Sequence, residues 1–124
     1  MTVMAVHDLL ARCARLCDQR DVDAWAALFT SDARFTVREV AYTGNAIRQW
    51  LVEQAENPAG CHVTVNVTVD SAGPDHAEAH ADFIFVRREE GKGPWGVVSA
   101  GQYKDKIVRV DNRWLFAERR IILR

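Results

Sequence analysis

The stretch that decides the fold is residues 61–70, CHVTVNVTVD, in which apolar and polar side chains alternate without a break. Alternation with a period of two predicts a β-strand, because successive side chains of a strand point to opposite faces of the sheet. One face would carry Cys61, Val63, Val65, Val67 and Val69, and the other His62, Thr64, Asn66 and Thr68. The polar face, headed by an imidazole, is either a solvated sheet face or the polar wall of a pocket.

Alternating segments continue after this strand, whereas the segments before it are mainly helical. Further strands are predicted over 76–89, 95–110 and 113–123, separated by turns or loops at 70–75, 89–94 and 111–112. Apolar residues at helical spacing predict helices over 3–20, from the N-cap Asp21 to about Phe29, and from Gly44 to a stop signal at 57–60. A turn at 30–32 and a strand over 33–40 lie between the second and third helices. This order predicts one α+β domain over 1–124, with helices packed on one face of a curved antiparallel sheet.

Composition argues against several classes of partner. The 124 residues hold 16 lysines and arginines against 17 aspartates and glutamates, so no basic surplus is available to neutralise the phosphates of a nucleic acid. No run of about 18 apolar residues is present, and we expect no membrane-spanning segment. The start, MTVMAVHDLLARCARLCD, lacks a basic leader and carries charges throughout, unlike a signal peptide. We therefore expect a cytoplasmic protein.

Two groups of residues resemble metal ligands but are interpreted otherwise. Cys13 and Cys17 are one helical turn apart, yet without a second pair they are predicted to be small core residues, and with Cys61 to be free thiols in a reducing compartment. Strand 76–89 carries a polar row composed of His76, Glu78, His80 and Asp82. Alanines and phenylalanines occupy the opposite face of this strand, so the polar row could equally be exposed to solvent. We therefore predict no metal site and no cofactor.

Three motifs carry a resemblance to a known family: LCDQRDVDAWAALFTSDARF at 16–35, HVTVN at 62–66 and SAGQYKDKIVRVDNRWLFAERRIIL at 99–123. In this order they make the chain resemble the SnoaL-like branch of the nuclear-transport-factor-2-like superfamily. The resemblance implies a cone-shaped α+β barrel, in which a strongly bent antiparallel sheet wraps around the N-terminal helices and leaves a pocket at the wide end. Members include scytalone and bile-acid dehydratases, ketosteroid isomerases, polyketide cyclases, a lindane dehydrochlorinase and the largely structural β subunits of ring-hydroxylating dioxygenases, so the fold alone does not define the chemistry.

The resemblance also implies candidate site residues. In the dehydratase and dehydrochlorinase members, an aspartate that ends the first helix pairs with a histidine on a central strand, and the matching residues are Asp18 and His62. Asn66 matches an asparagine that often follows the histidine, and Arg119 matches a pocket arginine of the dehydrochlorinase. A carboxylate on an imidazole fixes its tautomer, so the free nitrogen can accept a proton. The plain alternative is a satisfied polar histidine and an aspartate that only helps to end the helix.

One position departs from the family pattern. Many relatives carry a tyrosine or lysine five residues before the aspartate, whereas this chain has Cys13, and a thiol is a poor hydrogen-bond donor. The candidates for polarising a substrate instead are Tyr42, Tyr103, Asn66 and Arg119. Trp25 and Trp50, on helices that cover the concave sheet face, are predicted to wall the pocket, while core packing is the default for the other aromatic residues.

Two functions remain open at this point. The first is a small cofactor-independent enzyme that dehydrates, isomerises or cyclises an apolar oxygenated small molecule, with His62 as the base and Asp18 orienting it. The second is a non-catalytic ligand-binding or structural subunit that resembles a ring-hydroxylating dioxygenase β subunit. In either case we expect a homo-oligomer, in the simplest form a dimer, joined through the outer faces of the sheets.

Overall fold

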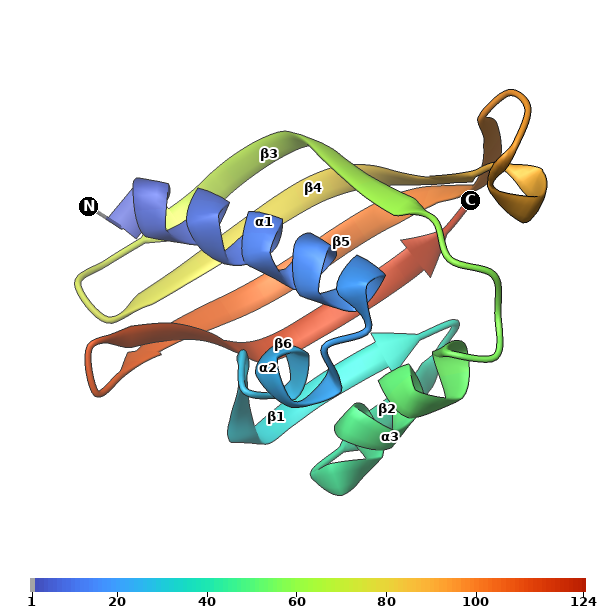
Figure 1. Ribbon diagram of the computed structural model, residues 1–124. Coiled ribbons are helices and arrows are strands. Elements are labelled where there is room, and N and C mark those ends of the chain that lie inside the picture. Colours follow the sequence, from blue (N-terminus) through green and yellow to red (C-terminus); the bar gives the residue numbers. More distant parts are fainter. Residues whose placement is uncertain (1) are drawn as a thin grey trace.

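The computed structural model describes residues 2–124, and within them three α-helices pack on one face of a six-stranded sheet (Figure 1). The helices are α1 (Thr2–Gln19), α2 (Val22–Ala26) and α3 (Asn45–Gln54). The strands are β1 (Phe29–Val37), β2 (Val40–Thr43), β3 (Cys61–Ala72), β4 (His76–Arg87), β5 (Gly96–Val110) and β6 (Arg113–Leu123). A short 3₁₀ turn, Glu89–Gly91, lies between β4 and β5. No helix in this described range is long and apolar enough to cross a membrane.

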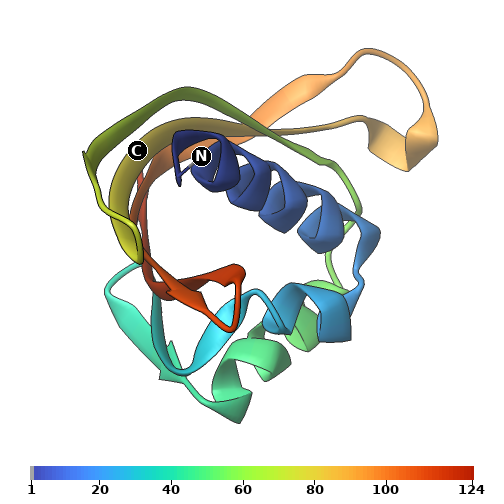
Figure 2. The same ribbon diagram turned by 90° about the vertical axis from the view of Figure 1, so that its left-hand side faces the viewer.

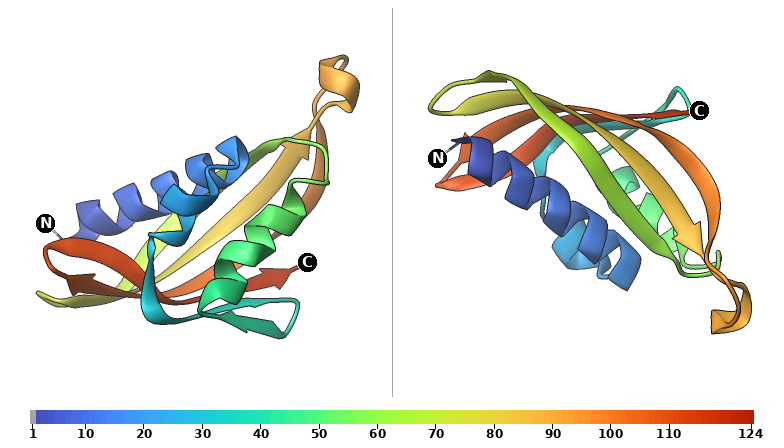
Figure 3. Two further views of the ribbon diagram at one scale, coloured as in Figure 1. Left: turned by 60° about the horizontal axis from the view of Figure 1, so that its bottom comes forward. Right: turned by 90° about the horizontal axis from the view of Figure 1, so that it is seen from above.

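The sheet bends around the helices, as predicted for a cone-shaped α+β fold. Its strand order is β2-β1-β6-β5-β4-β3. Seen end-on, the sheet curves around α1 (Figure 2). All three helices lie on the concave side in both views of Figure 3. One pair departs from the expected antiparallel arrangement, because β1 runs parallel to β6. These two strands come from opposite ends of the sequence, so no hairpin constrains their relative direction.

The alternation in the 61–70 stretch changes phase halfway along β3. Val65 pairs with Asp82 and Thr68 with His80, so β3 holds one extra residue, and Asn66 there has a φ of +52°. Such a β-bulge sends the residues on its two sides to opposite faces. Before it, His62 and Thr64 are half-buried beside α1 and Val63 and Val65 are exposed; after it, Val67 and Val69 pack on the core. The strand was predicted correctly, but a single apolar face along its whole length was wrong.

The region between α2 and α3 also differs from the prediction. The expected turn at 30–32 lies inside β1, where Phe29 pairs with Phe116 and Arg34 with Glu118, so the intervening residues bulge out of the ladder. The single strand predicted over 33–40 is two strands joined by a tight turn, in which Arg38 and Glu39 have φ values of +50° and +67°. Neither residue is a glycine or asparagine, the usual signal for such a turn.

The core fills one end of the cone and leaves the other end open. Trp25 contacts Phe29 and Phe35 edge-on or tilted, at ring-centroid distances of 5.0 and 5.5 Å, and Phe29 contacts Phe116 at 5.2 Å. The buried stripe of α1 covers this cluster with Val6, Leu9, Leu10 and Cys13. Aromatic packing of this kind dominates core energetics. Trp25 thereby holds α2 against β1, while α1 packs mainly along β3, and its last turn lies at the open end of the cone.

Candidate functional site

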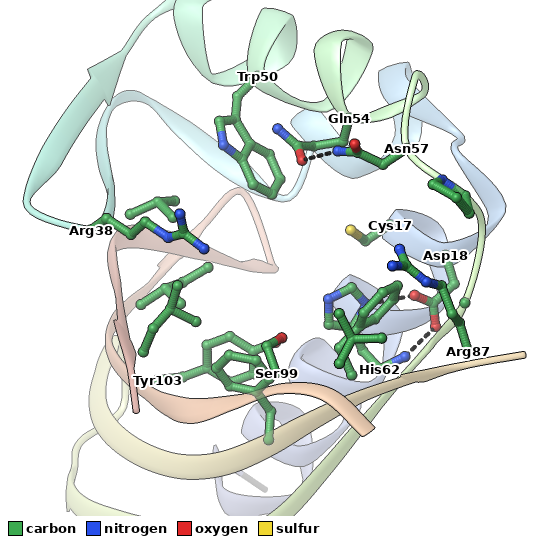
Figure 4. A pocket seen from close by; sticks show the side chains of 18 of the residues that line it. Cys17, Asp18, Arg38, Trp50, Gln54, Asn57, His62, Arg87, Ser99 and Tyr103 are labelled. Atoms are coloured by element: carbon green, nitrogen blue, oxygen red, sulfur yellow. Dashed lines mark hydrogen bonds and ion pairs between the residues drawn. The ribbon is translucent and has the colours of Figure 1, made fainter. Parts of the chain in front are cut away.

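A cavity of about 490 Å³ opens at the end of the sheet where β4 and β6 end and β3 and β5 begin (Figure 4). The last turn of α1, the C-terminal half of α3 and the β1–β2 turn complete its wall. Its apolar and aromatic lining consists of Val37, Val40, Tyr42, Trp50, Phe83, Phe85, Val98, Tyr103, Ile121 and Leu123. Its polar lining includes Asp18, Arg20, Arg38, Gln54, Asn57, His62, Arg87 and Ser99. A mostly apolar cleft of this size with a few convergent polar groups is typical of a small-molecule site.

The end of α1 brings Asp18 to this cavity. The helix ends at a left-handed residue, Arg20, with a φ of +59°, and the backbone N–H groups of Arg20 and Asp21 donate to the carbonyls of Cys17 and Leu16, both at 3.1 Å. Asp18 therefore lies in the last helical turn, where a carboxylate opposes the helix dipole. Such an unfavourable position calls for a compensating partner.

His62 is that partner. Its backbone N–H donates to Oδ2 of Asp18 at 2.9 Å, and its ring Nδ1 lies 2.6 Å from Oδ1. Because a carboxylate can only accept, Nδ1 carries the proton and Nε2 keeps a free lone pair. No residue within 2–124 hydrogen-bonds Nε2, and the ring lies at the cavity wall against Phe85, at a centroid distance of 4.6 Å (Figure 4). The arrangement can take a proton from a molecule held in the cavity.

Two predicted tyrosines and one tryptophan also line the cavity. Tyr42, Trp50 and Tyr103 contribute to its wall, and Tyr103 stacks on Phe83 with ring centroids 4.5 Å apart. Burial raises the pKa of Tyr103 above its usual range, so its hydroxyl stays protonated and can donate. Trp25 lies deeper: it is 2% exposed and stacks behind Trp50 at 5.7 Å, so it supports this wall and lines a much smaller adjoining cavity.

Arg119 is engaged by a buried network that sequence reasoning missed. Its guanidinium donates to both carboxylate oxygens of Asp105 at 2.9 and 3.2 Å and to the sulfur of Cys13 at 3.0 Å, and it lies 3.7 Å from the ring centroid of Tyr103. Burial alone would lower the pKa of Arg119, but Asp105, Cys13 and Tyr103 outweigh burial and raise it, so the guanidinium stays charged. Arg119 lines only the small adjoining cavity, and the neighbouring Arg120 is exposed. Arg119 thus lies behind the Tyr103 wall, while its donors are directed to protein atoms.

Asn66 does not join the other candidates. It is exposed, and its side-chain amide donates to Asp82 at 3.0 Å, because the bulge turns it to the outer face of the sheet. That face also holds a second histidine–carboxylate pair, between His80 and Asp70, outside the cavity. In the described part of the chain no three potential ligands group closely enough to hold a metal ion.

Several cavity residues were not predicted from the sequence. Arg20, Arg38 and Arg87 come from a helix end, a turn and a strand end, and no periodic pattern brings such positions together. Ser99 shares a strand face with Tyr103, so the alternation of β5 contained a signal for it. Cys17, predicted to pack in the core, lines the cavity, and burial raises the pKa of its thiol to about 12.

Comparison with known proteins identifies the family. Residues 2–120 match the family profile described as the SnoaL-like domain. The chain belongs to the SnoaL-like domain family. The family resemblance predicted from the three sequence motifs is therefore confirmed. A comparison of this SnoaL-like protein with curated proteins gives no match.

Solved structures with the same fold are similar over nearly the whole chain. A protein of unknown function from Mycobacterium tuberculosis superposes with a TM-score of 0.90 at 22% identity, covering 98% of this chain and 71% of that one. A candidate scytalone dehydratase from Novosphingobium aromaticivorans gives a TM-score of 0.84 at 23% identity, covering 98% and 83%. The β subunit of a candidate aromatic-ring-hydroxylating dioxygenase from the same organism gives 0.80 at 17% identity, covering 97% and 87%. At these identities the likeness shows the fold alone.

Proposed function

We propose that this SnoaL-like protein is a small enzyme that acts by general acid–base chemistry on an apolar, oxygenated molecule bound in the 490 Å³ cavity. The observation that carries the proposal is the contact between Asp18 and His62, which leaves Nε2 of an oriented imidazole at the wall of an otherwise mostly apolar cavity. A base in such a setting acts on a substrate from which bulk water is largely displaced.

His62 is the base in this proposal and Asp18 the group that orients it. Nε2 takes a proton from a carbon next to a carbonyl group, and the carboxylate of Asp18 stabilises the imidazolium that forms. The electron pair moves to the carbonyl oxygen as an enolate. In a dehydration the enolate then expels a hydroxyl group from the neighbouring carbon, and the imidazolium returns the proton to it, so that water leaves. Isomerisation and cyclisation need the same proton acceptor and donor, and none of these steps needs a cofactor.

Tyr103 and Tyr42 are the proposed donors to the developing oxyanion. Both line the cavity, and neither hydroxyl has a hydrogen-bond partner among residues 2–124, so each is available to a ligand. Preorganised donors of this kind contribute a large share of the stabilisation in reactions that form an oxyanion. They take the place of the donor that many relatives carry at the position of Cys13, whose thiol is buried and contacts Arg119.

The proton-transfer step can be tested without the natural substrate. 5-Nitrobenzisoxazole is a neutral, flat carbon acid: a base removes the proton on C3, the N–O bond breaks, and a coloured nitrophenolate forms. We expect the protein to accelerate this reaction beyond free imidazole at the same pH. His62→Ala should lower the rate by about two to four orders of magnitude. Asp18→Asn should also lower it, because an amide that donates to Nδ1 leaves the proton on Nε2.

The chain offers a matched control for this experiment. His80 is also paired with a carboxylate, that of Asp70, but on the outer face of the sheet, so His80→Ala should keep the full rate. Each variant must unfold at a temperature close to that of the wild type, since Asp18 also holds the backbone of β3 through the His62 N–H. Equal rates in His62→Ala and the wild type, or no catalysis beyond free imidazole, would remove the acid–base proposal.

A second candidate function is a non-catalytic subunit. The similarity to a β subunit of an aromatic-ring-hydroxylating dioxygenase favours it, at a TM-score of 0.80. A purely structural subunit does not need a histidine oriented by a carboxylate inside an open cavity, so we place this role second. Stable co-purification with an oxygenase α subunit, together with a His62→Ala variant that loses no activity, would reverse the order.

A further inference from the structure

The mouth of the cavity carries three arginines from separate parts of the chain. Arg20 follows α1, Arg38 lies in the β1–β2 turn and Arg87 ends β4, and all three line the cavity. Asp18 is the one carboxylate among the lining residues, and His62 occupies both of its oxygens. None of the three arginines forms an ion pair within residues 2–124. The mouth is therefore cationic, although the whole chain has a formal charge of −1.

Arg20 has an unsatisfied donor at this place. Its NH1 atom is buried without a hydrogen-bond partner in the described chain, while its NH2 atom donates weakly to the carbonyl of Asn57 at 3.4 Å. A buried guanidinium N–H without an acceptor is costly, and native proteins rarely leave one unpaired. Arg38 and Arg87 reach toward the cavity from opposite sides in Figure 4. The three side chains together offer donors and charge to an oxygen anion entering the mouth.

We infer that the ligand of this cavity is an aromatic or polycyclic carboxylic acid, whose carboxylate is held at the mouth by the positive charge of the three arginines. Its flat body lies between Trp50 and the stacked rings of Phe83 and Tyr103, with its reactive carbon near His62. The planar guanidinium fork of arginine matches the two oxygens of a carboxylate. The inference rests on the proposed function in taking the cavity as a ligand site, and it adds the charge and the orientation of the substrate.

The test compares two probes of the same shape by isothermal titration calorimetry. 2-Naphthoate carries a carboxylate where 2-naphthamide carries a neutral amide. We expect the protein to bind 2-naphthoate about tenfold more tightly or better, since hydrogen bonds to charged groups are the stronger ones. The preference should shrink as salt is added, because the arginines are partly exposed. The triple variant Arg20→Gln, Arg38→Gln, Arg87→Gln should lose the preference and still bind 2-naphthamide.

Arg120→Gln is the matched control, because Arg120 is exposed and does not line the cavity. It should keep the preference for 2-naphthoate. Equal affinity for the two probes, a preference that survives the triple variant, or binding of neither probe would overturn the inference. Its failure is distinguishable from failure of the proposed function: the benzisoxazole reaction uses a neutral probe and tests His62 alone, whereas the naphthoate preference tests the arginines alone.

Discussion

Replacing Arg119 by methionine should destabilise the protein more than most single substitutions, because it leaves the Asp105 carboxylate buried without a counter-charge. Both residues are 3% exposed, and two hydrogen bonds of 2.9 and 3.2 Å join them. Breaking a buried pair by removing one partner costs about 3–5 kcal/mol. The total free energy of unfolding of a domain is about 5–15 kcal/mol, so this is a large part of it. The melting temperature should fall by roughly 10–20 °C.

Urea unfolding followed by tryptophan fluorescence measures this loss. Arg120→Met is the control: it removes the same charge from an exposed neighbour and should change the free energy of unfolding by less than about 0.5 kcal/mol. The double variant Asp105→Leu, Arg119→Met should be more stable than Arg119→Met, because an apolar pair carries no unpaired charge. If the loss of stability in the double variant equals the sum of the losses in Asp105→Leu and Arg119→Met, the coupling between the two residues is refuted.

The Arg119→Met variant should also show a characteristic pH dependence. Burial raises the pKa of Asp105, and Arg119 opposes that rise more strongly than any other group, so the pKa should rise further in the variant. A raised pKa means that the folded state holds a proton which the unfolded state has released, so the stability of the variant should fall as pH rises above the unfolded value of about 4. The variant should therefore be closest to the wild type in mild acid. A loss independent of pH, or smaller than about 1 kcal/mol at pH 7, would refute the reasoning.

Three further predictions follow from packing and exposure. Cys61 is exposed and should be alkylated first by iodoacetamide at pH 7.5. Cys17 should react far more slowly, because burial raises the pKa of its thiol to about 12. Equal alkylation rates of the two thiols, measured by mass spectrometry, would contradict this prediction. Gly101→Ala should lower the free energy of unfolding in urea by about 1–3 kcal/mol, because the added Cβ would lie 2.3 Å from the carbonyl oxygen of Ile122 and 2.8 Å from the Phe83 ring. Gly96→Ala should cost much less, because no neighbour lies closer than 3.9 Å to its Cβ. Equal losses of stability in the two variants would count against this prediction. Light scattering should give a dimer, because Val63 and Val65 on the outer face of the edge strand β3 are 36% and 42% exposed, and a monomer at high micromolar concentration would refute this proposal.

Periodicity predicted the elements of this fold better than their faces. The strands at 76–89, 95–110 and 113–123 match β4, β5 and β6 within two residues at each end, because each alternates and ends at a turn signal. The bulge at Asn66 left no mark on the letters of the 61–70 stretch: alternation continued through it while the inward face changed. Only packing against α1 decides which face of the strand points inward on each side of the bulge. The parallel pairing of β1 with β6 likewise depends on tertiary packing.

The site was accessible from the sequence only where a motif existed. Asp18 and His62 were proposed together because of the family resemblance, since 44 residues separate them and no spacing rule links a helix end to a distant strand. Asp105 carries a signal of its own in the sequence: it shares a strand face with Tyr103 and Ile107, and a charge on a buried face predicts a buried partner. The three arginines at the mouth carried no such signal, because each lies at the end of its element.

The protonation state of the two ring nitrogens of His62 tests the proposed acid–base role most directly. For His62 to act as the base, Asp18 must hold the proton on Nδ1 and leave Nε2 free to accept one. Two-bond ¹H–¹⁵N correlation spectra of protein labelled with ¹⁵N-histidine, recorded above the titration of the imidazole, distinguish the two tautomers. We predict a protonated Nδ1 and an unprotonated Nε2 for His62, and the reverse in Asp18→Asn. A wild-type His62 with its proton on Nε2 would contradict the account, because no base would then face the cavity.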